Sequence, residues 1–406
     1  MLTVARDVEA VAPMIDPVAA APTARVASFE IAIDLAAVAA EWRDFERTAA
    51  GHVFQSCDFV STWLATVGAA RSVAPQIVLG RARDGTLVAI LPFGMTRCMG
   101  ARLLAWLGGE HADYHCGLYA PGFLEGLATD GDDAGPAFVR SVVALFRGRI
   151  DIAHFQRQPT MIGGAPNPFA TYRAVPYSAK SHLTRLGDSW ETYYRSKRNS
   201  SSRRHDRLKW QKLGASAPVE IVDARTPEEI EPILAAMFAQ KKASLSARGV
   251  PDMFACAGVP EFYREIARRP WPEGMSHVAA IRAGGDIVAA NWGLVRGDRY
   301  YYVMTSYCPG RFAVYSPGRA LMYHLMAWAI ERGIRIFDFT VGDEDYKGQW
   351  CEEMMTMHDS VVVLTPRGLP LGATFRALKL AKRVIKASPR LNRAVGQVRR
   401  RLAVGV

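Results

Sequence analysis

The chain has 406 residues, of which 50% are hydrophobic and 22% charged, so it is long enough for two domains with apolar cores. Its net charge of +11 is concentrated in two segments: residues 195–212 carry eight basic residues against Asp206 alone, and residues 367–406 carry eleven basic residues and no acidic one. Because the rest of the chain is net acidic, the composition argues against a protein that coats nucleic acid with its whole surface.

The cysteines and the apolar runs exclude further classes of protein. The six cysteines form no C-x-x-C pair, so we predict neither a zinc knuckle nor a disulfide framework, and we expect a reduced, cytoplasmic chain. Residues 1–27 are rich in Ala, Val and Pro but are interrupted by acidic residues, so we interpret them as a disordered leader rather than a secretory signal. No run of about 18 uncharged apolar residues occurs, so no transmembrane span is expected.

In the first half of the chain, the hydrophobic pattern predicts alternating strands and helices. In chain order we expect a strand at 29–33, a helix at 35–49, a helix from Asp58 as N-cap through 67, a hairpin of 76–81 and 86–93, a helix at 137–146, and a strand at 150–155. These elements assign residues 28–180 to a first α/β domain.

The second half repeats this order of elements, although the two halves show no residue-level identity that would prove a duplication. We expect one basic helix at 190–213 ended by Gly214, a strand at 219–222, helices at 227–243 and 260–267, a hairpin of 277–283 and 287–295, a strand at 300–306, a helix at 318–332, and strands at 335–340 and 359–364. Residues 181–366 are therefore predicted to form a second domain, followed by a basic amphipathic tail at 367–406.

The tail has the pattern of a helix that lies in a membrane interface. Its apolar residues fall near one helical face, and its basic residues form a neighbouring stripe: Phe375, Leu378 and Ile385 on the first, Arg376, Lys379, Arg383 and Lys386 on the second. Each basic residue near an anionic leaflet contributes about 1 kcal/mol. We therefore expect a peripheral contact with the anionic inner-membrane surface, the alternatives being a helix packed on the domain or a disordered tail.

Residues 300–350 carry a set of motifs in a specific order. They are Tyr315-Ser316-Pro317-Gly318, then Leu321 and Ala329, then Gly333, and then Phe337-Asp338-Phe339-Thr340-Val341-Gly342-Asp343-Glu344-Asp345-Tyr346-Lys347. This stretch resembles the distal half of a GNAT acyltransferase domain, in particular the CelD-like (BioF2-like) acetyltransferase family found with bacterial exopolysaccharide genes. The resemblance extends over residues 190–364, and more loosely from residue 29, and the tandem layout is similar to that of Fem-type transferases.

This resemblance implies an α/β fold with two tandem GNAT-like domains, each a mixed, largely antiparallel central sheet flanked by helices. The first domain would be non-catalytic and would shape the acceptor site. The second would transfer an acyl group, acetyl or longer, from acetyl-CoA or another acyl-CoA to an amine of an exopolysaccharide or amino-sugar glycolipid precursor, without a metal. Two alternatives stay open: Fem-type aminoacyl transfer, with aminoacyl-tRNA as the one expected nucleic-acid partner, and a non-catalytic GNAT-like binding scaffold.

The start of the helix at 318–332 is the candidate site for the donor. Ser316 is a residue type that caps helices, Pro317 fits the first turn, and Gly318 lets a ligand approach the backbone. The free N–H groups there could hold a phosphate, and the resemblance implies that of CoA, with Arg319 beside it. The alternative is an ordinary capped helix.

Asp343, Glu344, Tyr346 and Lys347 are the candidate catalytic residues. The acidic turn offers a general base for an amine, Lys347 an electrophile, and Tyr346 an acid or an orienting group. Carboxylates crowded in one turn should have raised pKa values, which suits a base near neutral pH. Which carboxylate is the base stays open, and a solvated acidic turn neutralised by Lys347 is the structural alternative.

The candidate substrate-binding residues come from three regions. They are Arg198 and Arg203 in the basic helix, Asn291, Trp292 and Tyr302 on adjacent strands, and Asp113 and Tyr114, which the family likeness assigns to the acceptor cleft. A solvated helix and ordinary sheet packing are the structural alternatives. The alternation of His111, Asp113 and His115 could place three metal ligands on one strand face, but we favour a hydrogen-bonded structural group there. Cys308 and Cys351 are interpreted as bystanders.

Overall fold

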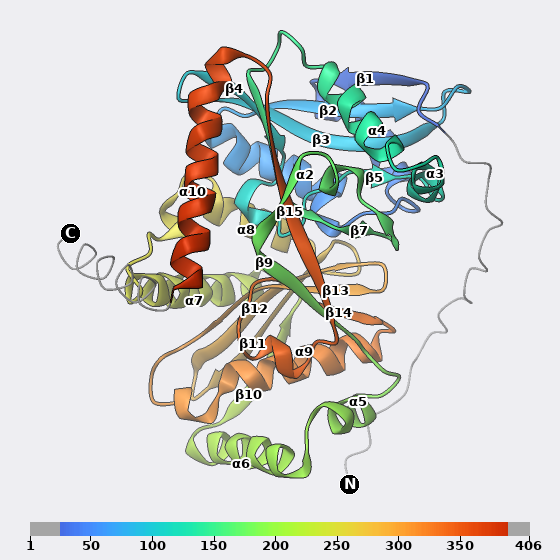
Figure 1. Cartoon of the computed structure of the whole chain (residues 1–406). Coiled ribbons are helices and arrows are strands. Elements are labelled where there is room, and N and C mark those ends of the chain that lie inside the picture. Colours follow the sequence, from blue (N-terminus) through green and yellow to red (C-terminus); the bar gives the residue numbers. More distant parts are fainter. Residues whose placement is uncertain (1–24, 389–406) are drawn as a thin grey trace.

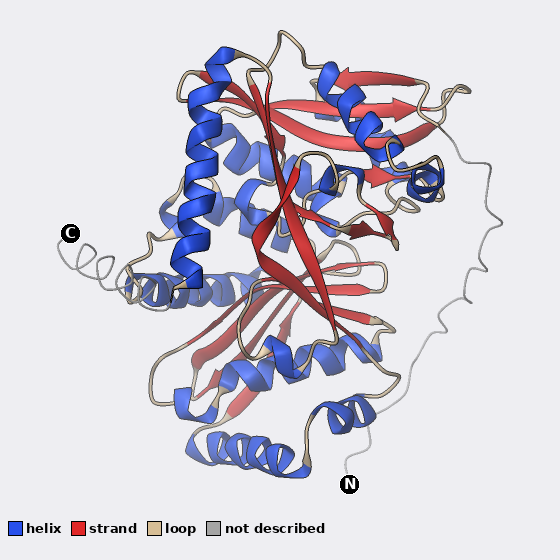
Figure 2. Cartoon of the chain, viewed as in Figure 1, coloured by secondary structure: helices blue, strands red, loops and turns tan. Residues whose placement is uncertain are grey.

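The computed structural model describes residues 25–388, whose strands join into one 13-stranded mixed sheet and one two-stranded ribbon. The sheet runs through the whole molecule, and helices cover it on both faces (Figure 1, Figure 2). Most of the predicted leader (residues 1–24) and the end of the predicted tail (residues 389–406) lie outside the described residues.

The strands and helices fall into two units. The first unit consists of β1 (Ser28–Ala32), α1 (Leu35–Phe45), α2 (Cys57–Trp63), β2 (Ala74–Arg81), β3 (Leu87–Cys98), β4 (Ala101–Trp106), β5 (Leu118–Tyr119), α3 (Phe123–Thr129), α4 (Ala134–Ala144), β6 (Ile152–Pro159), β7 (Met161–Ile162), β8 (Ala165–Pro166) and β9 (Ala174–Arg185). The second consists of α5 (Trp190–Lys197), α6 (Ser200–Ser216), β10 (Val219–Ala224), α7 (Pro227–Ser246), α8 (Val259–Ala267), β11 (Ser276–Ala283), β12 (Asp286–Arg296), β13 (Arg299–Tyr307), α9 (Pro317–Glu331), β14 (Ile336–Val341), β15 (Glu353–Val363) and α10 (Leu369–Ala387).

The two units repeat one order of elements and exchange their last strands. The strand order is β1-β2-β3-β4-β6-β15-β9-β14-β13-β12-β11-β10. β9, the last strand of the first unit, pairs with β14 of the second, while β15, the last strand of the second unit, pairs with β6 of the first. The expected architecture of two tandem, largely antiparallel sheets with helices is therefore confirmed. The expected boundary at residue 180, however, falls inside β9, because the exchange makes the two sheets continuous.

Apolar packing joins the two units in addition to the shared sheet. In the second unit, α7 packs on one face of β11–β13 and α9 on the other. The α7 face belongs to a buried cluster that also contains Trp42, Phe54 and Phe59 of the first unit, with Phe59 against Phe262 of α8. Each such side chain contributes roughly 1.5–3 kcal/mol on burial, so neither unit has a complete core without the other.

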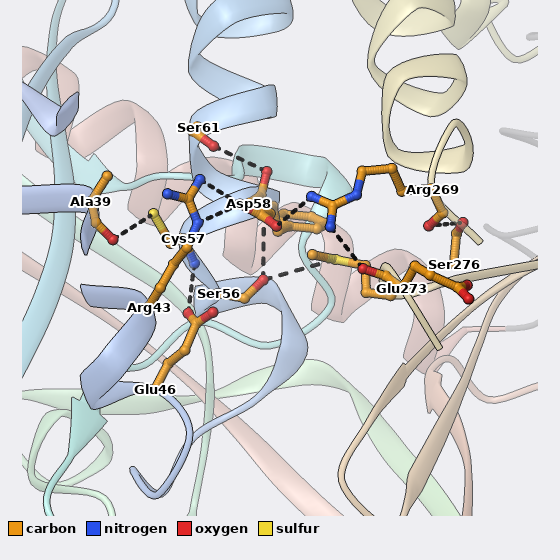
Figure 3. Close-up of polar contacts among 12 residues, drawn as sticks. Ala39, Arg43, Glu46, Ser56, Cys57, Asp58, Ser61, Arg269, Glu273 and Ser276 are labelled. Atoms are coloured by element: carbon orange, nitrogen blue, oxygen red, sulfur yellow. Dashed lines mark hydrogen bonds and ion pairs between the residues drawn. The ribbon is translucent and has the colours of Figure 1, made fainter. Parts of the chain in front are cut away.

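A polar cluster lies where α2 meets the loop before β11 (Figure 3). Arg43 of α1 donates twice to Asp58 Oδ1, at 3.0 and 2.8 Å, and Arg269 of the second unit lies 3.8 Å from Asp58 Oδ2. Because Asp58 is used in this way, the predicted N-cap is wrong: Ser56 caps α2, its Oγ accepting from the Phe59 N–H at 3.4 Å.

The basic helix is broken into α5 and α6, where a single helix was expected. Asn199 caps α6 through its side chain, which accepts from Ser202 N at 2.8 Å, and Arg203 Nη1 donates to the Arg198 carbonyl at 2.6 Å. These contacts end α5 at the break. Gly214 lies inside α6 and does not end it.

The first part of the tail forms α10, which packs along β15, β6 and β9 (Figure 1). Gly368 and Gly372 permit this close approach, since an added Cβ would meet the Asp151 carbonyl oxygen at 2.4 Å or Val363 at 2.9 Å. Within residues 25–388, no helix is both long enough and apolar enough to cross a membrane.

Candidate active site

Two parallel strands separate at the centre of the second unit. β13 and β14 pair through three residues, the last pair being Tyr301 and Asp338, and the register of β14 against β9 then shifts. Thr340 lies in this irregular segment with a φ of 56°, a left-handed conformation that is strained for a β-branched residue. Strand separation beside a strained residue exposes backbone and side-chain groups that a regular sheet would pair.

Asp338 connects the end of the β13–β14 pairing to the first unit. Its carboxylate is fully buried and accepts from Tyr114 Oη at 2.7 Å, from Thr340 N at 2.8 Å and from Arg299 Nη1 at 3.1 Å. Burial raises the pKa of Asp338, and these three partners oppose the rise. The Tyr114 contact crosses between the units, so Tyr114, which the family likeness assigns to the acceptor cleft, lies against β14 of the second unit.

Asp113 lies beside the same segment. Its side chain is 19% exposed and sits 3.8 Å from Arg157 Nη1. Burial raises the pKa of Asp113, while Arg157, the Thr340 side chain and Lys347 lower it without cancelling the rise. Asp113, Tyr114, Asp338, Thr340 and Lys347 are called the inter-unit site below.

The acidic turn departs from the prediction. Lys347 is almost completely buried beneath the turn, with its Nζ 2.9 Å from Glu344 Oε2 and 3.4 Å from the Gly342 carbonyl oxygen. Burial alone would raise the pKa of Glu344, but the Lys347 ammonium holds it below its ordinary value. The expected rise is therefore wrong for Glu344. Asp343 instead accepts from Lys180 N at 3.2 Å and lies 3.6 Å from His182 Nε2.

Tyr346 and Cys351 flank Lys347. Burial raises the pKa of the Tyr346 phenol, and Tyr302 and Glu344 raise it further, so Tyr346 stays protonated. Its ring packs 6.0 Å from that of Phe339, and Tyr302 packs in the same aromatic group, 5.8 Å from Phe339. Burial raises the pKa of the Cys351 thiol to about 12, which does not suit a nucleophile.

The start of α9 opens into a groove of about 390 Å³, called the α6–α9 groove. Ser316 occupies the N-cap position, but its φ is 56° and its side chain caps no backbone N–H; its Oγ accepts from Lys209 Nζ at 2.8 Å. The lining combines cations with aromatic rings: Trp190, Tyr194, Arg203, Asp206, Arg207, Lys209, Trp210, Ile221, Tyr315, Ser316, Arg319, Ala320, Tyr323, His324 and Ala327. Among the described residues, neither Arg207 nor Lys209 has a carboxylate partner, so both are available to an anion.

Asp206, which sequence reasoning passed over, organises this groove. Its buried carboxylate accepts from Tyr194 Oη at 2.8 Å and from Tyr323 Oη at 2.9 Å, and it pairs with Arg198 and Arg319 at 3.4 and 3.5 Å. Its position as the lone acid in a basic run was the available signal. Arg198 is therefore held internally, as is Arg203 through its bond to the Arg198 carbonyl.

The groove and the inter-unit site are joined by one short segment. Trp350 follows the 3₁₀ turn Lys347–Gln349, and its ring lies 5.3 Å from that of Tyr323 and 6.5 Å from that of Tyr194. Its carbonyl oxygen accepts from Lys197 Nζ at 2.6 Å. The segment 347–350 thus connects Lys347 to the aromatic side chains that line the groove.

Asn291 and Trp292 do not line a cleft. Trp292 is 1% exposed and donates its indole N–H to the Tyr263 carbonyl at 3.3 Å. Asn291 is fully buried, and its amide bonds to the Tyr300 hydroxyl at 2.8 Å. The interpretation of these two residues as acceptor-cleft residues is not supported, because β12 is covered on both faces.

A second network that the sequence did not reveal links β10 to α9. Asp223 lies 3.0 Å from His277 Nε2 and 2.9 Å from the Nε2 of His324, which lines the α6–α9 groove. Burial raises the pKa of Asp223, but hydrogen bonds from the two histidines hold it well below its ordinary value. Within residues 25–388, no group of three or more His, Cys, Asp or Glu side chains could hold a metal ion. His111 and His115 lie in a short 3₁₀ turn and a loop, where Trp63 and the Gln156 carbonyl contact them.

The first unit lacks a comparable site. β4 and β6 also pair through three residues and then separate, but Phe93, Trp106, Phe155 and Phe169 fill the space with rings 4.3–6.0 Å apart. The N-cap position of α4, the counterpart of α9, is occupied by Asp133, whose carboxylate pairs with Arg140 at 2.5 Å, so this helix start offers no unpaired cation to a phosphate. Only the second unit combines separated strands with a cationic helix start.

Comparison with known protein families places an enzyme class on this second unit. Residues 200–348 match the family described as the acetyltransferase (GNAT) domain. The chain therefore contains a GNAT-type domain and is an acyltransferase. The matched residues include α6, the strands β10–β14, α9 and Lys347. No curated protein matches the chain.

Solved structures show the same fold over most of the chain. FemX aligns with a TM-score of 0.57 at 10% identity, over 82% of this chain and 98% of FemX. A conserved protein of unknown function from Bacteroides thetaiotaomicron aligns with a TM-score of 0.50 at 9% identity, over 82% and 100%.

Proposed function

We propose that the protein is an N-acyltransferase of the CelD-like type, which moves an acyl group from a CoA-type thioester to an amine on an exopolysaccharide or amino-sugar glycolipid precursor. The observation that carries this proposal is the inter-unit site. There β13 and β14 separate, and Asp113 of the first unit approaches Thr340 and Lys347 of the GNAT-type domain. The first unit would thus supply a reacting group as well as shape the acceptor site.

Asp113 is the general base in this proposal. Its pKa is raised by burial, whereas the pKa of Glu344 is lowered by Lys347, so Asp113 is the stronger base of the two. Asp113 takes the proton from the acceptor amine, and the nitrogen then attacks the thioester carbonyl carbon. The C–S bond breaks, and the departing thiolate takes from Asp113 the proton that came from the amine, which restores the base. Tyr346, whose raised pKa keeps its phenol protonated, would donate a hydrogen bond to the developing charge. Lys347 fixes the turn that carries Tyr346.

The α6–α9 groove is the donor side of this proposal. Arg207 and Lys209 offer positive charge beside the start of α9, and Trp210 and Tyr315 offer aromatic surface. These features suit the phosphates and the base of a CoA donor. The donor's reacting end would then pass Trp350 to reach Lys347 and Asp113.

The test is thiol release from acetyl-CoA and longer acyl-CoAs in the presence of amino-sugar acceptors, with donor affinity measured separately by calorimetry. Asp113→Asn should lower kcat at least about 100-fold while leaving donor affinity unchanged, because a positioned base contributes that much or more. Asp132→Asn is the matched control, since Asp132 is exposed in the loop between α3 and α4. Full turnover by Asp113→Asn would refute the assigned base, and no turnover with any acyl-CoA would refute the donor.

A Fem-type aminoacyl transfer is the second candidate. The fold shared with FemX and the exposed cations of α6 favour it, since Arg204, Arg207 and Lys212 could contact a tRNA backbone. In that case charged tRNA would bind with a steep salt dependence, and acyl-CoA would neither bind nor turn over. A non-catalytic scaffold would bind its ligand equally well in wild type and Asp113→Asn, with no turnover in either.

A further inference from the structure

Helix α10 has two different apolar faces. One is docked on the sheet: Leu371 is 2% exposed, and Phe375 stacks on His154 with ring centroids 4.1 Å apart. On the same side, Lys379 Nζ lies 3.0 Å from the buried Asp359 carboxylate. Phe375, which the sequence placed on a membrane-facing surface, is therefore used to hold the helix to the protein.

The other apolar face points away from the sheet. Leu369, Ala373, Ala377, Leu380 and Val384 follow one another at spacings of four, four, three and four residues, and all five are exposed. Leu369 is 58% exposed, Leu380 62% and Val384 48%. At 100° per residue, Leu380 lies opposite Leu371 on the helix. These five residues are called the outer stripe.

The charge around the outer stripe favours an anionic partner. Arg367 and Arg376 are exposed beside it, and the sequence from residue 367 to residue 406 contains eleven basic residues and no acidic one. Residues 389–406, the last 18 of the sequence, follow α10 along the chain. A helix with an apolar stripe and cationic flanks is the combination that binds the interface of an anionic bilayer.

We propose that α10 docks the protein on an anionic lipid bilayer, with the outer stripe inserted at the boundary between head groups and acyl chains. The opposite face stays on β15 and β6, so the helix lies in the membrane plane without leaving the protein. The contact would fix the orientation of the whole molecule at the membrane, because α10 is packed rigidly against the shared sheet. This proposal does not depend on which acyl group or acceptor the enzyme uses.

The test is co-sedimentation of the full-length protein with vesicles of phosphatidylcholine alone or mixed with phosphatidylglycerol. Binding should require phosphatidylglycerol and weaken as salt rises. The double variant Leu380→Glu and Val384→Glu should lower the partition coefficient at least about tenfold, since it places two charges in the apolar boundary. Ile33→Glu, at a 66% exposed apolar residue of the first unit, is the matched control and should bind as wild type.

An unchanged thermal unfolding midpoint shows that α10 of the double variant remains docked, because both substituted side chains are exposed. Equal vesicle binding by wild type and the double variant would overturn the proposal. The proposal would also be overturned if a chain ending at residue 388 no longer bound vesicles, because the cations removed with residues 389–406, rather than the outer stripe, would then carry the contact. A dimer in lipid-free solution that the double variant abolishes would assign the outer stripe to a second copy of the chain and overturn the membrane role.

Discussion

The hydrogen bond from Tyr114 to Asp338 allows a quantitative test of how the units are joined. Asp338 is fully buried and has three donors, of which Tyr114 is the only one from the first unit among the described residues. Tyr114→Phe removes this donor and keeps the ring, including its stacking 4.4 Å from His52. A hydrogen bond to a charged group is worth about 1.5–3 kcal/mol, so the free energy of unfolding should fall by that amount at pH values where Asp338 is ionised.

The pH dependence of this loss has a definite sign. Burial raises the pKa of Asp338 in the folded protein, so its ionised form is disfavoured there and stability falls as the pH rises through that pKa. Loss of the Tyr114 hydroxyl raises the folded-state pKa further. The difference between wild type and variant is therefore largest above the pKa of the variant, and below the pKa of the wild type it falls to that of a neutral hydrogen bond, about 0.5–1.5 kcal/mol.

Urea unfolding followed by tryptophan fluorescence, at a series of pH values from about 4 to about 9, measures both quantities. Tyr119→Phe is the control, because Tyr119 is equally buried in the same unit but has no carboxylate partner among the described residues. It should change stability by less than about 1.5 kcal/mol at every pH of the series. A Tyr114→Phe loss that matches the control, or one that stays constant over the whole pH series, would refute the assignment of Asp338 as a buried carboxylate held by Tyr114.

Two further substitutions test other contacts between the units. Arg296 donates to the carbonyls of Glu46, Ala49 and His52 at 2.8, 3.1 and 2.8 Å, so Arg296→Lys should cost about 2–4 kcal/mol of unfolding free energy. The control Arg282→Lys, at a partly exposed side chain with one ion pair of 3.7 Å to Glu220, should cost almost nothing. Equal effects of the two substitutions would contradict the role of Arg296. Gly258 has a φ of 80° and an added Cβ would lie 2.6 Å from the Thr66 carbonyl oxygen, so Gly258→Ala should lower the thermal midpoint more than Gly285→Ala, which has a φ of 88° and open space around it. Similar shifts for the two glycines would show that backbone strain of about 1 kcal/mol acts alone.

The sequence by itself determined the order of the elements. Hydrophobic periodicity located both hairpins, the helices α1, α4, α7, α8 and α9, and the repeat of one order in the two halves. These signals are local, because each depends on residues a few positions apart along one helix or strand. It missed β4 and β9, whose mixed polar and apolar residues give no clean alternation.

Residue types at the helix start and the acidic turn directed attention to a segment that forms part of the candidate site, but the roles of individual residues could not be read from them. The sequence predicted a raised pKa within the acidic turn, whereas Lys347 lowers that of Glu344 and the raised value belongs to Asp113. It offered Arg198 and Arg203 as free cations, whereas Asp206 and the break between α5 and α6 hold them.

Only the tertiary structure showed which residues of the first unit complete the candidate site of the second unit. The exchange of β9 and β15 brings Asp113 and Tyr114 to a site more than two hundred residues away in sequence, against Asp338 and Thr340. Such contacts depend on strand pairing and burial over the whole sheet, and burial is what sets the pKa of Asp113 and Asp338. Local pattern fixes the elements, while long-range packing fixes the dielectric surroundings and the partners of each charge, and therefore the chemistry.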